Sequence, residues 1–264
     1  MVQICAIASG SNGNCYYIGN DKEAVLIDAG ISRRQILKRM KMKKLDIRKV
    51  KAVFITHEHS DHMRGVRVLA DSHNIPVFFT DDTLQKTRVQ YRPDNVKLFE
   101  AGESITIGDH TVFSFSKNHD AADPVSFRVE VEGVNVGVFT DIGEPCDNVK
   151  QHLESCDAAF LETNYDEQML WAGAYPRHLK VRVASGRGHL SNDQAKELVD
   201  SLASGRLKHL FLSHISADNN RVEFALDTFS DLQDKMNIVA TSRYAPSDVL
   251  ELQPAVQLKA GSKE

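Results

Sequence analysis

Short apolar runs alternate with helical patterns through the first ninety residues. The apolar runs are bounded by Gly, Asn, Asp or Pro, which predicts strands at 3–9, 15–19, 24–30, 51–56 and 76–80. Between them, a helix is expected to begin after Ser32 as N-cap, with Ile36, Leu37 and Met40 on one face. Two further helices are expected at 61–74, with Val66, Leu69 and Ala70 inward, and at 82–90.

The middle of the chain changes to closely spaced strands, many of them alternating apolar and polar residues, separated by turns that contain Gly. They are predicted at 96–102, 104–108, 110–118, 125–133 and 134–141, as an antiparallel meander. Helices then return at 147–155, 166–170, 191–203 and 221–236, around strands at 158–164 and 209–214. This order predicts an α+β fold of four layers, α/β/β/α, in which two mixed sheets pack face to face. No linker or repeat divides the chain, so residues 1–264 are interpreted as one domain.

The segment FITHEHSDHMRG, at 54–65, places four metal-binding side chains directly after an apolar strand: His57, His59, Asp61 and His62. In an extended segment, residues two apart point to the same side, so His57 and His59 can bind one ion. Asp61 and His62 come where the loop turns into a helix and can face a second ion. The segment therefore predicts part of a binuclear site.

Other strands also end on residues of this type. VFT leads to Asp141, LFLS leads to His214, and FSFSKN leads to His119. Strand ends are rigid positions at which several side chains can converge. We therefore expect His57, His59, His119 and Asp141 at one ion, and Asp61, His62, Asp141 and His214 at the other, with Asp141 shared. Nitrogen and carboxylate ligands without thiolate suit zinc, manganese or iron.

Composition limits the surroundings of such a site. The net charge of −4 argues against a basic surface over the whole protein, so a contact with nucleic acid would be a local patch. There is no apolar run long enough to span a membrane and no secretory signal pattern, and the four cysteines lack CxxC spacing. A cytoplasmic protein with reduced thiols is expected, while the oligomeric state stays open.

Two polar loops are candidates for binding substrate. In GRGHLSND, Gly186 and Gly188 allow close approach of an anion, His189 can donate a proton, and Ser191 caps the next helix. The loop SGSNGN offers Ser9, Ser11 and Asn14. Both loops are also explained by ordinary turn and capping chemistry. The basic residues Arg177, Lys180, Arg182 and Arg187 precede the GHLS segment and can follow a phosphate backbone or simply form a solvated face.

With HEHSDH, His119, FTD and LSH in place, the chain resembles the metallo-β-lactamase superfamily, whose fold is an αββα sandwich with a binuclear site. Segments such as ASGSNGNCYYI, HDAADPVSF, ETNYDEQMLWAGAYPRHLK and GRGHLSN are similar to one bacterial branch, the YycJ/WalJ group of 5′→3′ DNA exonucleases. This resemblance implies Asn164 near the substrate, and a nucleic-acid partner with DNA favoured over RNA. Tyr165 departs from the branch, which is expected to have His there.

The residues therefore predict a metallo-hydrolase with two divalent ions, in which Asp61 orients or deprotonates water and His189 protonates the leaving group. A 5′→3′ DNA exonuclease in repair is the preferred interpretation. Hydrolysis of a thioester, lactam or cyclic phosphodiester with the same ligands remains an alternative. So does a metal-dependent nucleic-acid-binding module without catalysis.

Overall fold

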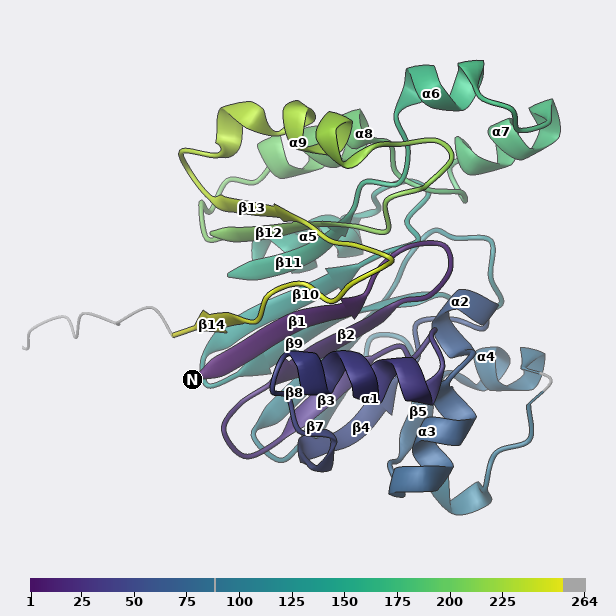
Figure 1. Ribbon diagram of the computed structural model, residues 1–264, viewed down its shortest axis with the longest axis vertical. Coiled ribbons are helices and arrows are strands. Elements are labelled where there is room, and N and C mark those ends of the chain that lie inside the picture. The colour runs from purple at the N-terminus through teal and green to yellow at the C-terminus, as the bar shows by residue number, and fades with distance from the viewer. Residues whose placement is uncertain (88, 254–264) are drawn as a thin grey trace, which may run out of the picture.

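Two seven-stranded mixed sheets packed face to face form the centre of the computed structural model, which describes residues 1–87 and 89–253 (Figure 1). The first sheet has the order β14–β1–β2–β3–β4–β5–β6, with bounds Leu250–Leu252, Val2–Ala8, Cys15–Gly19, Ala24–Ile27, Val50–Phe54, Val77–Phe79 and Val96–Leu98. The second has the order β13–β12–β11–β10–β9–β8–β7, with bounds Asn237–Ala240, His209–Ser213, Ala158–Glu162, Val134–Phe139, Val125–Val131, His110–Ser116 and Ser104–Ile107.

Helices cover the outer face of each sheet and complete the four layers (Figure 1). On the side of the first sheet lie α1 (Arg33–Met42), α2 (Ser60–Met63), α3 (Val66–His73) and α4 (Asp81–Lys86). On the side of the second lie α5 (Asp147–Glu154), α8 (Asn192–Asp200) and α9 (Val222–Thr228), while α6 (Glu167–Ala172) and α7 (Arg177–Val183) project at one corner. The predicted α+β sandwich is confirmed.

The apolar core has three parts, because both sheets are buried on both faces. Along β1, Ile4 and Ala6 belong to the core between the sheets, whereas Cys5 and Ile7 belong to the core under α1 and α3. A third core packs α5, α8 and α9 on the second sheet. This alternation follows from the period of two along a strand. It explains why the strand sequences are almost continuously apolar.

Several predicted elements differ from the structure. Segment 96–102 was assigned to the meander, but its strand β6 pairs in parallel with β5 in the first sheet. The helix expected at 61–74 is interrupted at 64–65, and the one expected at 221–236 stops at Thr228 before a 3₁₀ turn at Ser230–Leu232. The helix expected at 82–90 ends at Lys86. Strands β13 and β14 and helix α7 were not predicted, since each is short and has no strong apolar period.

The ends of β2, β3 and β4 are joined by backbone hydrogen bonds that fix the segment with the HxHxDH pattern. Asn14 N donates to Asp61 O at 2.7 Å, and Gly30 N donates to Asn14 O at 2.7 Å. Ala29 and Gly65 add bonds of 2.9 and 2.8 Å between the chain after β3 and the segment at 62–65. A Cβ atom on Gly30 would lie 1.6 Å from Asp61 O. Glycine is therefore required here because two backbones touch.

Among residues 1–87 and 89–253, we find no helix that combines the length and the apolar character needed to cross a membrane.

Gly30→Ala is expected to lower the free energy of unfolding by roughly 1–3 kcal/mol, because the new methyl group overlaps the Asp61 carbonyl and the backbone must shift. Urea unfolding followed by circular dichroism would measure this as a lower midpoint with an unchanged slope. Gly186→Ala is the matched control, since its Cβ would meet only the flexible Glu144 side chain, at 3.3 Å. Equal midpoints for both variants would show that the contact at Gly30 is not tight.

Candidate metal centre

The side chains predicted as ligands converge beyond the carboxyl ends of the strands, where β3, β4, β10 and β12 end. Three residues at these ends, Asp28, Asp141 and His214, have φ values of 61°, 56° and 54°, in the left-handed region. Non-glycine residues rarely adopt this conformation, at a cost of about 1–2 kcal/mol each. The turn redirects each side chain from the sheet into the space between the strand ends.

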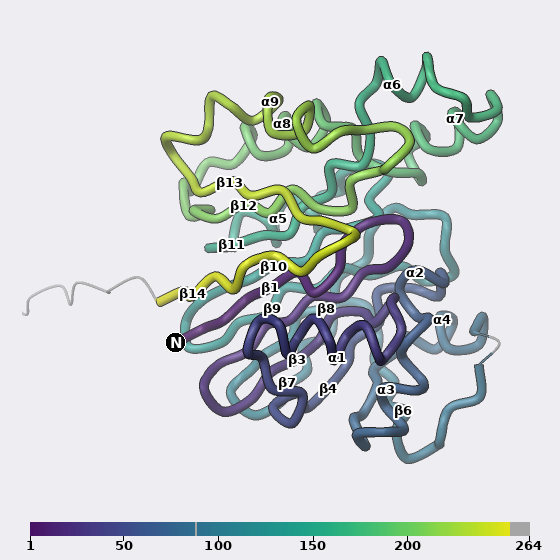
Figure 2. The backbone as a smooth tube through the Cα atoms, in the orientation of Figure 1, coloured from purple at the N-terminus to yellow at the C-terminus, as the bar shows by residue number. Residues whose placement is uncertain are grey.

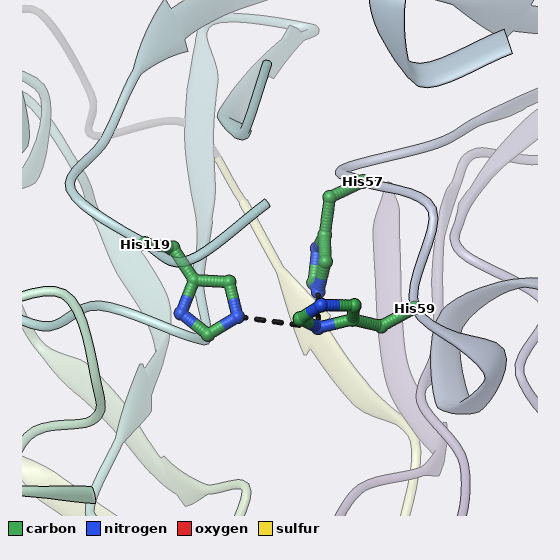
Figure 3. Close-up of side chains that lie close together, drawn as sticks. All are labelled: His57, His59 and His119. Atoms are coloured by element: carbon green, nitrogen blue, oxygen red, sulfur yellow. Dashed lines mark hydrogen bonds between the residues drawn. The ribbon is translucent and has the colours of Figure 1, made fainter. Parts of the chain in front are cut away.

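His57, His59 and His119 form the first cluster (Figure 3). His57 Nε2 lies 3.0 Å from His59 Nδ1, and His119 Nε2 lies 3.4 Å from the same His59 nitrogen. Figure 3 shows the three rings turned toward one another. Three imidazole nitrogens facing one point are the arrangement expected of ligands to a transition metal.

Asp61, His62, Asp141 and His214 form the second cluster, whose ligand-type atoms all lie within 4.8 Å of one another. Asp61 Oδ2 lies 3.5 Å from His62 Nε2 and 3.7 Å from His214 Nε2. Asp141 Oδ2 lies 3.0 Å from His62 Nε2, while its Oδ1 lies 3.9 Å from His119 Nε2 in the first cluster. Asp141 therefore stands between the clusters, where a shared ligand is expected.

The other ring nitrogens of these histidines are held by oxygen acceptors. His62 Nδ1 lies 2.7 Å from Asp28 Oδ2, His119 Nδ1 lies 3.1 Å from Gly188 O, and His57 Nδ1 lies 2.9 Å from Thr56 Oγ1. An Nδ1–H bond to an oxygen leaves Nε2 with a free lone pair. Metal-binding histidines in proteins are oriented in this way.

Glu162, at the end of β11, was not among the predicted residues. It is fully buried, and its Oε1 lies 2.8 Å from both His189 Nδ1 and His214 Nδ1. Its Oε2 accepts from the backbone N–H groups of Ile142 and Leu190 at 2.7 and 3.3 Å. One carboxylate thus orients a predicted ligand and the predicted general acid together. Asp28 was not predicted either. Glu162 and Asp28 are both single acidic residues at the end of an apolar strand, outside any motif of metal-binding residues.

Burial and charge oppose each other in this cluster. Burial disfavours charge on His214 and His62, but the surrounding carboxylates, Asp141 foremost, outweigh it and raise the pKa of His214 to about 10 and that of His62 well above its usual range. In the first cluster burial prevails and lowers the pKa of His119 to about 4. The second cluster therefore attracts positive charge, while burial lowers the pKa of both His57 and His119 in the first, so that they present neutral imidazole nitrogens.

The residues fit divalent cations. Among the described residues, His214 Nε2 is buried and makes no hydrogen bond, and buried Asp141 Oδ2 has no contact with hydrogen-bond geometry, although His62 Nε2 lies 3.0 Å away. Such orphaned polar atoms carry a desolvation cost unless a ligand satisfies them. The donors around them are imidazole nitrogens and carboxylate oxygens, which suit zinc, manganese or iron. The assignment of the seven residues as ligands stays a prediction.

Several residues predicted to bind substrate make hydrogen bonds to the predicted ligand residues, and their role toward substrate stays a prediction. Ser9 Oγ accepts from His214 N at 2.8 Å, and Asn164 Nδ2 donates to His214 O at 2.9 Å. Asn14 Nδ2 lies 3.1 Å from His62 Nε2, and Arg187 donates to His119 O at 3.1 Å. Gly188 is buried beneath the loop and uses its carbonyl on His119. The polar groups named here are hydrogen-bonded to His62, His119 or His214.

Ser191 is the N-cap of α8 and forms a capping box, in which its hydroxyl accepts from Gln194 N and Gln194 Oε1 accepts from Ser191 N. Ser11 is exposed, and His189 is partly exposed beside the ligands. Tyr165 is buried, 1% exposed, and pairs through its backbone with Ser191. It is therefore part of the packing beneath this loop and belongs to none of the clusters of metal-binding residues.

The basic run is partly neutralised by internal contacts. Arg182 Nε donates to Asp120 Oδ2 at 2.6 Å, and Lys180 Nζ donates to the Trp171 carbonyl at 2.7 Å. These bonds attach α7 to the loop that carries His119 and to the end of α6. They leave Arg177 as the exposed cation of this helix that makes no side-chain hydrogen bond or ion pair within the described chain.

A family model described as the β-lactamase superfamily domain matches residues 23–215. The exodeoxyribonuclease YycJ of Bacillus anthracis is 35% identical over 222 residues, covering 83% of this chain and 84% of that protein. The exodeoxyribonuclease WalJ of Streptococcus pneumoniae is 33% identical over 224 residues, covering 83% of each chain.

Solved structures agree on the fold. The metallo-β-lactamase fold protein YhfI from Bacillus subtilis superimposes with a TM-score of 0.72 at 16% identity, covering 95% of this chain and all of that one. Human tRNase Z, short form, gives a TM-score of 0.62 at 14% identity, covering 94% of this chain and 100% of that one. At these identities the likeness concerns the fold.

Glu162→Gln is expected to weaken binding of Zn²⁺ or Mn²⁺ by about 10- to 100-fold, because the amide NH₂ would face either the two imidazoles bound by Oε1 or the two backbone N–H groups bound by Oε2, and the negative charge is lost. Isothermal titration calorimetry on metal-free protein would measure the change. Glu197→Gln, on the exposed side of α8, is the matched control. Unchanged affinity in a folded Glu162→Gln variant would show that Glu162 does not orient the ligands.

Proposed function

This chain belongs to the β-lactamase superfamily, in the YycJ/WalJ group, and from that premise we propose that it is a two-metal phosphodiesterase that removes nucleotides from an end of DNA. The observation that carries the proposal is the pair of adjoining clusters, His57, His59 and His119 beside Asp61, His62, Asp141 and His214. The relatives named exodeoxyribonuclease supply the substrate class. We propose the 5′→3′ direction, which rests on the resemblance to this branch.

In this proposal, His57, His59 and His119 would hold one divalent ion, Asp61, His62 and His214 would hold another, and Asp141 is placed to serve both. Zinc, manganese and iron are the candidates. Two bound ions supply Lewis acidity toward the phosphodiester oxygens and lower the pKa of water at the site. A metal centre of this kind suits phosphodiester hydrolysis because charge develops on several oxygens in the transition state.

The chain's own groups have separate tasks around that centre. Asp61 is 19% exposed by its side chain and lies beside His62 and His214, so its carboxylate can orient the attacking water or accept its proton. His189 is 22% exposed, and its Nδ1 is bonded to Glu162, which leaves Nε2 for the substrate. We assign His189 the donation of a proton to the leaving oxygen.

The surroundings are compatible with a nucleic-acid chain. Exposed Arg177 on α7 and the partly exposed His189 lie along the same chain segment as Arg187, whose guanidinium supports the His119 carbonyl. A phosphate backbone can bind cations arranged along such a segment. We propose a cytoplasmic role in DNA repair, with single-stranded DNA ends as the first substrates to test.

Asp61→Ala is expected to reduce hydrolysis of an end-labelled oligonucleotide by at least about 100-fold, since both the water-orienting carboxylate and a ligand are lost. The fold should be retained, because Asp61 is at the edge of the site and outside the apolar cores. Circular dichroism and gel analysis of the products would check the two statements. Activity near that of the unchanged protein would contradict the proposed role of Asp61.

His189→Ala is expected to lower kcat by about 10²- to 10⁴-fold, the usual contribution of a general acid, with metal content nearly unchanged. Metal analysis and steady-state kinetics on the same preparation separate these effects. Equal losses of metal and turnover would instead indicate that His189 is a metal ligand. His189 Nδ1 lies 3.8 Å from Asp141 Oδ1, close enough for such a role.

Substrate and direction are tested together with DNA and RNA oligonucleotides labelled at either end, single-stranded or paired, in Mn²⁺, Mg²⁺ or Zn²⁺. Release of labelled mononucleotide from the 5′ end of DNA at the earliest times is expected. A ladder that shortens from the 3′ end would reverse the direction. Absence of turnover with every metal, combined with binding, would favour a non-catalytic module.

A further inference from the structure

A cavity of about 230 Å³ lies beside the metal centre, and neither the ligand set nor the proposed chemistry uses it. It is enclosed by the start of the SGSNGN loop, the segment after His214 and the turn after β13. Residues that line it include Ser9, Ser216, Asn220, Arg221, Arg243 and Tyr244. Figure 2 shows the yellow chain after β13 turning beside the purple loop between β1 and β2.

The cavity is directly connected to the metal centre through Ser9. The Ser9 hydroxyl accepts from His214 N at 2.8 Å while the same residue lines the cavity. Ile215 and Ser216, which follow His214 in the chain, form another part of the wall. A group bound here would therefore be next to one bound at the metals.

The turn that carries Arg243 and Tyr244 is held firmly by its backbone. The buried Arg39 of α1 donates to Arg243 O and Tyr244 O, both at 3.0 Å, and to Ile7 O at 3.0 Å. Ser9 N donates to Ser242 O at 3.3 Å. The position of the turn thus depends on main-chain bonds to a buried arginine and needs no contact from the Tyr244 ring.

The side chains on this turn make few contacts with the rest of the described chain. Tyr244 is 79% exposed, the highest value among the exposed large hydrophobic side chains of the described residues. Its ring lies 5.9 Å from the Arg243 guanidinium. Arg221 is exposed, and within residues 1–87 and 89–253 neither arginine forms an ion pair. Arg243 Nε donates to Asn12 Oδ1 at 3.1 Å, which places its cationic group at the cavity rim.

An exposed aromatic ring on a fixed turn, flanked by two unpaired arginines, is the combination that binds single-stranded nucleic acid, since bases stack on the ring and phosphates pair with the cations. We propose that this cavity binds the nucleotide next to the scissile phosphate of a single strand. Tyr244 stacks on its base, and Arg221 and Arg243 pair with phosphates. This assignment rests on the proposed function and names where the strand lies.

The dimensions favour one unpaired nucleotide. Cavities for drug-sized ligands measure about 300–1,000 Å³, so 230 Å³ suits a single small group and excludes a base pair. A base inside a duplex is stacked on both faces and paired along its edge, so a nucleotide behind the terminal pair cannot offer a face to Tyr244. The site therefore predicts selection for single-stranded or frayed ends.

Binding is tested by fluorescence anisotropy with a 3′-labelled, hydrolysis-resistant phosphorothioate 8-mer and metal-loaded protein. Tyr244→Ala is expected to weaken binding of the single strand by about 5- to 150-fold, whereas Tyr244→Phe keeps the ring and stays within about twofold. The same 8-mer in a blunt duplex should show no such loss. Deoxyribose and ribose versions distinguish DNA from RNA as the source of the strand.

Arg221→Ala and Arg243→Ala are each expected to reduce the slope of log K against log salt by about 0.7, one phosphate contact on a single strand. Arg206→Ala is the matched control, because Arg206 pairs with Asp157 before β11, at the opposite end of the second sheet from the metal centre. A merely structural effect would lower affinity without changing the slope. Unchanged slopes in both variants would overturn the assignment of these arginines.

Turnover separates this proposal from the proposed function. Tyr244→Ala should lower kcat/KM for the single-stranded 8-mer with ordinary linkages but leave hydrolysis of methyl p-nitrophenyl phosphate unchanged, because the one ring of that small ester is the leaving group and a methyl group stands where the neighbouring nucleotide would be. If Tyr244→Ala binds and cleaves oligonucleotides normally, the cavity is not the nucleotide site. If the unchanged protein hydrolyses neither substrate, phosphodiesterase function fails, and the anisotropy result still decides the assignment of the cavity.

Discussion

The concentration of acidic groups at one buried sheet edge is the constraint on which the rest of the site depends. Asp28, Asp141 and Glu162 are almost completely buried, and Asp61 lies in one cluster with Asp141. Carboxylates this close repel strongly where water is excluded, and each desolvated charge costs several kcal/mol. The raised pKa values of His62 and His214 show how the protein alone balances this charge, by retaining protons on imidazole. Cations that replace those protons would stabilise the folded state as well as prepare it for hydrolysis.

The double sheet makes such a concentration tolerable, because it fixes the backbone from which the side chains project. Three apolar cores bury both faces of both sheets, so the strand ends cannot move apart to relieve repulsion. Left-handed turns at Asp28, Asp141 and His214 store strain at the same places. Packing energy from the sandwich thus offsets both the strain and the electrostatic cost at its edge.

Most strands and most residues of the candidate site could be predicted from the sequence. The elements and residues that could not be predicted have a physical feature in common with ordinary ones. Apolar period identified most strands, and the HxHxDH spacing with the strand-end residues identified side chains that do lie together. Strand β6 was assigned to the wrong sheet because apolar period does not reveal a strand's partner. Glu162 and Asp28 were missed although AFL-Glu162 and VLI-Asp28 end apolar strands as LFLS-His214 does. A single carboxylate after a strand carries no spacing signal that distinguishes a site residue from an ordinary turn residue.

The polar loops show how polar groups next to the predicted ligands are used within the fold. Ser9, Asn14 and Asn164 were expected to face the substrate, yet each is hydrogen-bonded to a ligand's side chain or backbone. Near a buried charged site, every polar group within reach is needed to satisfy the framework, since unpaired buried groups are costly. Groups that are free to bind substrate are then expected farther from the predicted ligands, where the backbone is fixed but the side chains remain solvated. Arg221, Arg243 and Tyr244 have that character, and their sequence context, in loops without ligand spacing, gives no indication of it.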